Sequence, residues 1–132
     1  MFESINWLAI LVASISSFVL GGLWYSPVLF LNAWLADMNV ETDKAGHPAK
    51  VFGLAFVFST IGCIVMSGFM VVGEGILAGA LLGLKVGLGF VFCSFGINYQ
   101  FANRPIRALL IDGGYHTLQF LIYGLILGAW PW

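Results

Sequence analysis

The sequence has few charged residues: only 8% of its 132 residues are Asp, Glu, Lys or Arg, whereas 61% are hydrophobic. Soluble domains carry roughly 25% charged residues, and a water-soluble fold of this length has no means of hiding so much apolar surface. The mean hydropathy of +1.00 is typical of a protein whose solvent is lipid. The composition therefore excludes an ordinary soluble domain and predicts an integral membrane protein whose first partner is the lipid bilayer.

Basic charge and reactive motifs are also scarce. The formal net charge is -1, and without a basic patch to neutralise phosphates we expect no nucleic-acid partner. No nucleophile elbow, zinc-protease helix, phosphate loop or dinucleotide fingerprint is present, so we expect no enzymatic activity, no cofactor and no metal site. Cys63 and Cys93 both lie in apolar runs, at depths that differ by about 15 Å. This separation is too large for a disulfide, and we interpret both as packing residues.

Four apolar stretches are long enough to cross a membrane: 5–24, 51–73, 75–99 and 108–130. About 20 apolar residues cross the hydrocarbon core as a helix, and these stretches lack the alternation of barrel strands. The first stretch has no basic segment before it and is longer than a typical signal-peptide core, so we expect it to be retained. The predicted fold is an all-α, four-transmembrane-helix bundle that forms a single transmembrane domain over 1–132.

The positions of the basic residues predict the orientation of this bundle. Lys44 and Lys50 lie in the first loop, and Arg104 and Arg107 lie in the third, whereas the second loop and both termini hold no Lys or Arg. Cytoplasmic loops of membrane proteins carry an excess of Lys and Arg. We therefore expect the first and third loops to be cytoplasmic and both termini to be external.

The first loop is long enough to hold structure of its own. Pro27 ends or kinks the first helix. Within residues 28–38, a helical arrangement places Leu31, Trp34 and Met38 on one face, which favours a short helix lying in the membrane interface. A plain hydrophobic loop is the alternative interpretation. The aromatic motif expected at this interface comprises Trp24, Tyr25, Pro27 and Trp34.

A row of small residues marks the third predicted helix. Its glycines are four residues apart and therefore share one face: Gly75, Gly79, Gly83 and Gly87. Such a face lets a neighbouring backbone approach closely, which drives helix association in lipid. The spacing favours a contact within the bundle, and a contact with another subunit remains the alternative.

Ionisable residues lie inside two of the predicted spans. Each costs at least about 2 to 3 kcal/mol on insertion scales when it is placed at depth. Asp112 and His116 are one turn apart on one face of the fourth helix, and Lys85 lies at a similar depth on the third. These three residues form a candidate intramembrane polar site, to which Tyr115 and Asn98 can add hydrogen bonds.

Two interpretations of this site are open. In the functional one, it is a polar pathway in which His116 titrates near neutrality and relays protons. In the structural one, Asp112 pairs with a cation of the cytoplasmic face, His116 bonds a backbone carbonyl and Lys85 extends toward the interface. The candidate cations of that face are Arg104, Arg107 and Lys50. Under both interpretations we expect the Asp112 carboxylate to face the interior and to meet a cationic or hydrogen-bond-donating side chain.

Several segments of the sequence resemble a known family. They are Ile5-Asn6-Trp7, Gly22-Leu23-Trp24-Tyr25-Ser26-Pro27-Val28-Leu29-Phe30, Trp34, Arg104-Pro105, Leu110-Ile111-Asp112-Gly113-Gly114-Tyr115-His116 and Gly128-Ala129-Trp130. The chain resembles, over nearly its whole length, the small bacterial membrane proteins catalogued as domain of unknown function 1761. The resemblance implies a multi-spanning protein of the bacterial inner membrane and brings no activity with it.

The functional expectation combines these observations. The first hypothesis is a small transport-related or channel-like protein with a polar site near Asp112 and His116. Because a lone four-helix bundle offers little interior, this hypothesis calls for a homo-oligomer or a larger membrane complex. The alternative is an accessory or scaffold subunit of such a complex, with no transport activity of its own.

Overall fold

The computed structural model describes residues 5–131, and these residues form helices joined by turns, with no strand among them. Three helices are long and apolar enough to cross a membrane: α1 (Trp7–Trp24), α3 (Pro48–Ser67) and the continuous helix Gly75–Phe101. The helix α6 (Ile106–Ala129) has 24 residues but carries more polar side chains. The expectation of an all-helical protein with apolar, membrane-compatible helices is therefore confirmed.

The helix Gly75–Phe101 contains a change of helical type at its centre. It begins as α4 (Gly75–Leu84), continues as the π-helical segment η2 (Lys85–Phe92) and ends as α5 (Cys93–Phe101). The wider π turns are uncommon and occur frequently at functional sites. In this chain, η2 lies beside the middle of α6, where the predicted polar residues are found.

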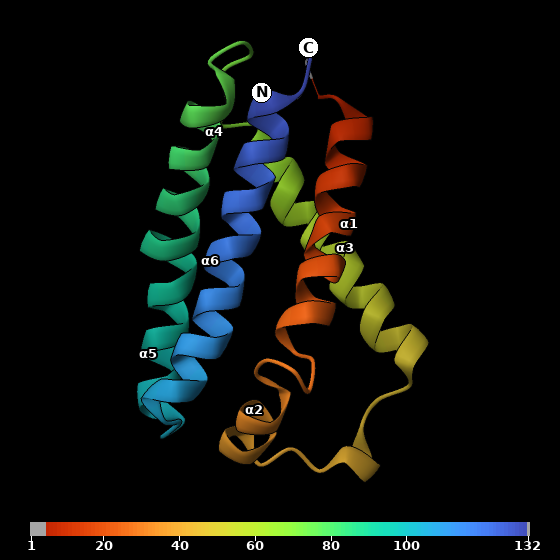
Figure 1. Ribbon diagram of the computed structural model, residues 1–132, viewed down its shortest axis with the longest axis vertical. Coiled ribbons are helices and arrows are strands. Elements are labelled where there is room, and N and C mark those ends of the chain that lie inside the picture. Colours follow the sequence, from red (N-terminus) through yellow and green to blue (C-terminus); the bar gives the residue numbers. More distant parts are fainter. Residues whose placement is uncertain (1–4, 132) are drawn as a thin grey trace.

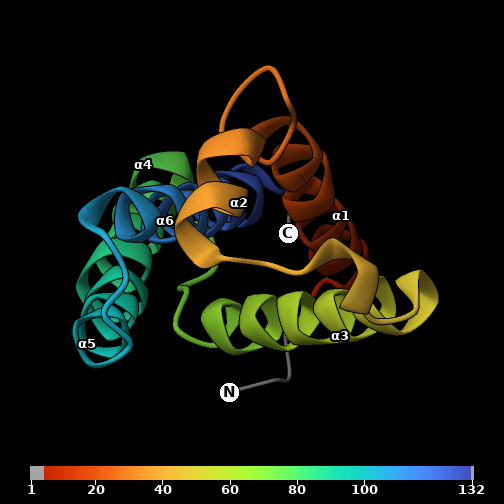
Figure 2. The same ribbon diagram turned by 90° about the horizontal axis from the view of Figure 1, so that it is seen from below.

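The helix α6 occupies the centre of the bundle (Figures 1 and 2). On one side it contacts α4, η2 and α5, and on another it contacts α1, while α3 crosses a third side and packs mainly against α1. The start of α1 and the end of α6 lie at the same end of the bundle as the turn between α3 and α4, which we call the α3–α4 end. The opposite end holds the short helix α2 (Leu31–Met38) and is called the α2 end.

The helix α2 begins and ends at recognisable local signals. After α1 ends at Trp24, the chain turns at Pro27, which cannot continue a helix. α2 is shorter than the predicted segment 28–38 because the residues before Leu31 form this turn, with Leu31 N–H donating to the Ser26 carbonyl at 3.2 Å. It ends at Asn39, whose φ of 52° lies in the left-handed region. The single-turn helix η1 (Thr42–Lys44) follows in the first loop.

The helix α3 differs most from its predicted bounds of 51–73. It begins earlier because Pro48 suits a first helical position and His47 Nδ1 accepts from Ala49 N–H at 3.2 Å. It ends at Ser67, and turns follow up to α4. Gly73 and Gly75 have φ values of 85° and 88° there, a conformation that glycine adopts without steric cost.

Three glycines of the predicted row, Gly79, Gly83 and Gly87, face α6, whereas a carbon added at Gly75 would meet no atom within 4 Å. A methyl group at Gly79 would overlap the Gly124 carbonyl oxygen, and one at Gly83 would overlap that of Phe120. At Gly87 the added carbon would lie 2.8 Å from the Thr117 Cα. The row therefore makes a backbone-to-backbone contact within one chain, as the spacing favoured.

The larger of two buried hydrophobic clusters lies toward the α3–α4 end, and the smaller, of Tyr99, Ala108 and Leu109, lies toward the α2 end. The larger cluster, which we call the buried core, comprises Ala9, Ile10, Ala13, Cys63, Met66, Tyr123 and Leu127. α3 contributes only Cys63 and Met66, from its last turns, whereas all its residues from 48 to 55 are exposed. The first half of α3 thus diverges from the other helices, as Figure 2 shows, and this divergence creates the cleft described below.

Candidate functional site

The Asp112 carboxylate is the meeting point of four helical segments. Its side chain is nearly buried on α6 and accepts three hydrogen bonds. Tyr25 Oη, just after α1, donates to Oδ1 at 2.5 Å, and Trp34 Nε1, on α2, donates to Oδ2 at 3.1 Å. The Tyr99 hydroxyl, on α5, also donates to Oδ2. Asp112 therefore connects α1, α2 and α5 to the central helix.

The three donors of Asp112 are neutral groups. The carboxylate thus faces the interior and meets hydrogen-bond donors, as the sequence predicts, and within residues 5–131 no cation forms an ion pair with it. Aromatic hydroxyl and indole groups satisfy the carboxylate oxygens without a second buried charge. The structural interpretation expected a cation beside Asp112 and a backbone carbonyl beside His116; instead Asp112 meets neutral donors, and His116 meets the Gln119 side chain.

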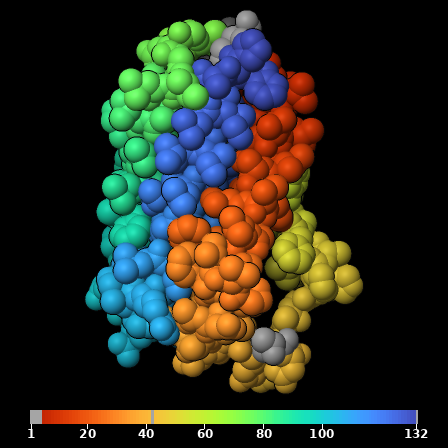
Figure 3. All heavy atoms as spheres, in the orientation of Figure 1, coloured from red at the N-terminus to blue at the C-terminus, as the bar shows by residue number. Residues whose placement is uncertain are grey.

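The two arginines of the third loop bind α2 instead. Arg107 forms a bidentate ion pair with Asp37, from Nε to Oδ2 at 2.7 Å and from Nη2 to Oδ1 at 2.6 Å. Arg104 Nη1 lies 3.5 Å from the Asp37 carbonyl oxygen. Hydrogen bonds from Arg107, and then its charge, lower the pKa of Asp37 below its usual range. Figure 3 shows α2 seated against the beginning of α6, while Lys50 is exposed at the start of α3.

The two glycines after Asp112 make room for aromatic rings. A methyl group at Gly113 would overlap the Phe92 ring, and one at Gly114 would lie 3.3 Å from Trp24 Cζ2. Trp24 Nε1 also donates to the Ile111 carbonyl at 2.9 Å. The Asp-Gly-Gly segment of α6 and the aromatic motif after α1 are thus complementary parts of one contact.

A second polar cluster follows Asp112 along α6. His116 Nδ1 lies 2.7 Å from Gln119 Oε1, and Gln119 Nε2 donates to Tyr123 Oη at 2.8 Å. Gln119 Nε2 is also 3.4 Å from Ser59 Oγ on α3, and Tyr123 Oη donates to the Ser59 carbonyl at 3.3 Å. The His116 ring stacks on Phe95, with centroids 5.0 Å apart. These contacts form a continuous hydrogen-bonded line on one face of α6.

This line borders open space beneath α3. A cavity of about 410 Å³ lies between α3, η2 and α6, and its polar lining includes Ser59, His116 and Gln119. A second cavity of about 390 Å³ lies between α1 and α3. Both are lined by Ala55, Ser59 and Tyr115, so the two cavities adjoin. We call this combined space the α3 cleft.

The remaining predicted site residues lie in different places. The Tyr115 hydroxyl donates to the Ser17 carbonyl at 2.9 Å and borders the α3 cleft. Lys85 and Asn98 are exposed, and among the described residues neither side chain bonds to Asp112. Lys85 borders a separate cavity between α4 and the end of α3. The structure thus joins Asp112, His116 and Tyr115 along α6 and leaves Lys85 and Asn98 apart from them.

The sequence analysis missed several members of both clusters. Gln119 and Tyr123 stand three and seven residues after His116, a spacing that places all three on one helical face. That spacing could have predicted that Gln119 and Tyr123 belong to the same polar cluster as His116. Tyr99 and Ser59 carried no comparable signal, because their contacts join different helices, and helical spacing within one helix does not predict such contacts.

Comparison with known proteins identifies the family. The family model described as protein of unknown function (DUF1761) matches residues 8–128. The chain therefore belongs to this family, in agreement with the resemblance seen in its motifs. Searches among curated proteins and among solved structures gave no match.

Proposed function

We propose that this chain is a multi-pass protein of the bacterial inner membrane that crosses the bilayer four times, with the α2 end in the cytoplasm. The 24 residues of α6 extend about 36 Å, enough to cross the hydrocarbon core. Its side chains Asp112 and Gln119 are buried within the bundle. Lys44 and Arg104 lie in the loops at the α2 end, and Lys50 and Arg107 lie in the first turns of the helices that follow these loops, which supports this orientation.

The helix α2 is proposed to lie at the cytoplasmic interface. Trp34 and Asp37 hold it against α6, so it covers the end of the bundle instead of extending away from it. Amphipathic indole rings are favoured at the level of the headgroups. In this position α2 closes the cytoplasmic side of the Asp112 cluster.

Within this topology we propose a transport-related function: the α3 cleft binds a small solute that crosses the membrane. The observation that carries the proposal is the line His116, Gln119 and Tyr123 beside a cavity of about 410 Å³. Polar groups at membrane depth are expensive and are typical of substrate or ion pathways. Asp112, whose oxygens are already bonded, acts as the structural support of this site.

The packing of α3 supports access to the cleft from the cytoplasm. Toward the α2 end, its first turns lie away from the other helices. Toward the α3–α4 end, apolar side chains pack against the buried core and separate the cleft from that side of the membrane. They include Ile64, Met70, Leu82 and Phe120. This arrangement is that of a binding cleft open to one side of the bilayer.

A second subunit is part of the proposal. Phe52 and Phe58 on α3 are largely exposed, at 63% and 69%, and border the α3 cleft. Another copy of the chain, or a partner in a larger membrane complex, would separate the cleft from lipid. Light scattering in detergent tests this point, and we expect a homo-oligomer.

Cysteine accessibility tests the proposed cleft and orientation together. Ala55 borders the cleft, whereas its neighbour Leu54 is exposed and borders neither cavity of the cleft. In a background with Cys63→Ala and Cys93→Ala, we expect a membrane-impermeant maleimide to label A55C in inside-out vesicles and to leave L54C largely unlabelled. A cysteine in place of Glu41, in the first loop, serves as the positive control for the cytoplasmic side.

The outcomes separate the two functional hypotheses. Selective labelling of A55C requires water in the cleft and supports transport. Equal protection of A55C and L54C would mean that lipid or a partner helix fills the cleft, which is the result expected of an accessory subunit. Labelling of the Glu41→Cys variant on intact cells would reverse the proposed orientation.

A further inference from the structure

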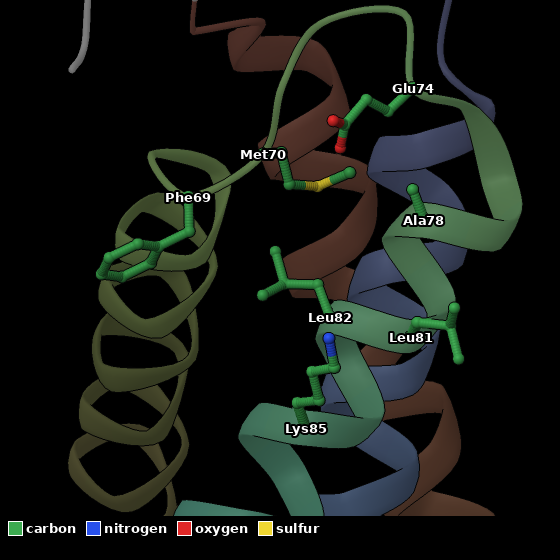
Figure 4. A pocket seen from close by; sticks show the side chains of 7 residues that line it. All are labelled: Phe69, Met70, Glu74, Ala78, Leu81, Leu82 and Lys85. Carbon is green, nitrogen blue, oxygen red and sulfur yellow. The ribbon is translucent and has the colours of Figure 1, made fainter.

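A third cavity, of about 280 Å³, lies at the α3–α4 end of the bundle. It is bordered by the end of α3 and by one face of α4, and the two functional clusters on α6 contribute no side chain to it. Figure 4 shows the Lys85 ammonium group and the Glu74 carboxylate directed into this cavity from its two ends. Met70 and Leu82 lie beside the space between them.

The spacing of these two charges follows from the sequence. Glu74 precedes α4, Ala78 lies in its first turn and Lys85 begins η2, and all three border this cavity. The ten helical steps from Gly75 to Lys85 alone span about 15 Å at 1.5 Å per residue. This distance is too large for a direct ion pair, and the ion pairs within residues 5–131 include neither residue. The small side chain of Ala78 leaves the space between them open.

The depth of Lys85 makes its position informative. It stands ten residues inside the membrane-compatible helix Gly75–Phe101, which is about 15 Å from its beginning. Charged side chains at such depth are rare, face a protein interior or a hydrated cavity, and are paired. A ligand with an anionic group near Lys85 would provide the missing partner. Because Glu74 faces the same cavity, that ligand is stabilised further when it also carries a cationic group.

We propose, resting on the transport-related function proposed above, that this cavity binds a small zwitterion at the external mouth of the solute route. The anionic group, a carboxylate or a phosphate, binds Lys85, and an ammonium group a few ångströms away binds Glu74. The cavity volume of about 280 Å³ lies at the lower end of the range of ligand pockets, about 300 to 1,000 Å³, and suits a small molecule. The same chemistry is found in free amino-acid-like molecules and in the phosphoethanolamine headgroup of a lipid.

Binding to the purified full-length protein tests the proposal. Phosphoethanolamine is the zwitterionic probe, and inorganic phosphate is the probe that lacks an ammonium group, both titrated calorimetrically into delipidated protein. We expect phosphoethanolamine to bind more tightly than phosphate. Lys85→Met and Glu74→Gln should each weaken its binding by about tenfold or more, because a charged hydrogen-bond partner is lost. The matched controls Lys50→Met, at the start of α3, and Glu41→Gln, in the first loop, should leave binding unchanged.

A second experiment, with lipids, distinguishes a lipid headgroup from a soluble zwitterion as the ligand. Protein from nanodiscs that contain equal amounts of phosphatidylethanolamine and phosphatidylglycerol is examined by native mass spectrometry. Retention of phosphatidylethanolamine by the wild type and its loss in Lys85→Met identify a headgroup as the ligand. Binding of free phosphoethanolamine without selective lipid retention identifies a soluble zwitterion.

Other results would overturn the proposal. Equal affinity for phosphate and phosphoethanolamine, with no effect of Glu74→Gln, would define a simple anion site. Absence of both free-probe binding and lipid selectivity would show that Lys85 and Glu74 form no site. Lys85→Met removes a charge from the apolar span, so the variant is expected to fold, and its melting temperature checks this. Cleft labelling at A55C is measured independently, so that failure of the transport proposal is distinguishable from failure of zwitterion binding.

Discussion

The central helix α6 has two neighbours that it contacts in opposite ways. Toward α4 the contact is made by backbone atoms, because Gly79 and Gly83 on α4 and Gly124 on α6 carry no side chain there. Toward α3 the central helix presents large side chains, among them Phe120, whose ring would lie 3.6 Å from a methyl group at Gly62. The backbones of α4 and α6 are therefore in direct contact, whereas large side chains keep the backbones of α3 and α6 apart.

The difference shows how one helix serves both stability and a site. In lipid, helices associate through close packing of small residues, so the glycine contact fixes α4 and η2 against α6. The opposite face of α6 is then free to carry His116, Gln119 and Tyr123 beside a cavity. The close contact between α4 and α6 holds α6 in place, which the looser contact between α3 and α6 does not do.

The largest expected effect on stability comes from adding a side chain at the close contact between α4 and α6. Gly83→Leu places a side chain where the Phe120 carbonyl lies, and overpacking of this kind typically costs about 1 to 3 kcal/mol or more. Gly53→Leu is the matched control, because no atom lies within 4 Å of an added carbon there. We expect a much lower melting temperature in detergent for Gly83→Leu than for Gly53→Leu. Equal melting temperatures would contradict the intrachain glycine contact.

The next effect concerns the buried carboxylate that joins the segments at the α2 end. Asp112→Asn replaces one carboxylate oxygen by an NH2 group, which cannot accept a hydrogen bond, so at least one of the donors Tyr25, Trp34 and Tyr99 loses its acceptor. A buried donor left unsatisfied costs about 1 to 3 kcal/mol. We expect a lower melting temperature and faster proteolysis of the first loop, whereas the exposed Asp43→Asn should resemble the wild type. If Asp112→Asn kept full stability but abolished transport, Asp112 would belong to the solute route itself.

A smaller effect is expected on the open side. Ala55→Phe adds a ring to the α3 cleft, where space already exists, so the stability should change by only about 0.5 kcal/mol. In the same cysteine-free background, it should slow maleimide labelling of a Ser59→Cys variant. A large loss of stability would indicate that α3 packs more closely against α6 than the cleft implies.

The smallest effect concerns the ion pair between Asp37 and Arg107. Because Arg107 lowers the pKa of Asp37, the pair contributes stability that is fully present above the usual aspartate pKa of about 3.9. This contribution is lost as the pH falls through the lowered pKa of the folded protein. Asp37→Asn should therefore lower the melting temperature slightly at pH 6 and have little further effect near pH 2. A difference that persists unchanged at low pH would contradict this origin.

Part of the site could be predicted from local pattern. The interior position of Asp112 follows from the cost of a carboxylate at depth, and the one-sided glycine row follows from a spacing of four residues. The identity of the Asp112 partners did not follow. Arg104 and Arg107 are near in sequence, but α2 supplies Asp37 to them, and the carboxylate is left to Tyr25, Trp34 and Tyr99.

The sequence by itself determined the class of the protein, its helical composition and the face by which α4 packs, because composition and periodicity are local properties. Only the tertiary structure decided that Lys85 borders a cavity away from the buried Asp112, and that α3 diverges to leave a cleft beside His116. These outcomes depend on which helices become neighbours and at what angle. Side-chain volumes at contacts between distant segments determine these neighbours and angles, and the residue spacing within a single helix does not predict them.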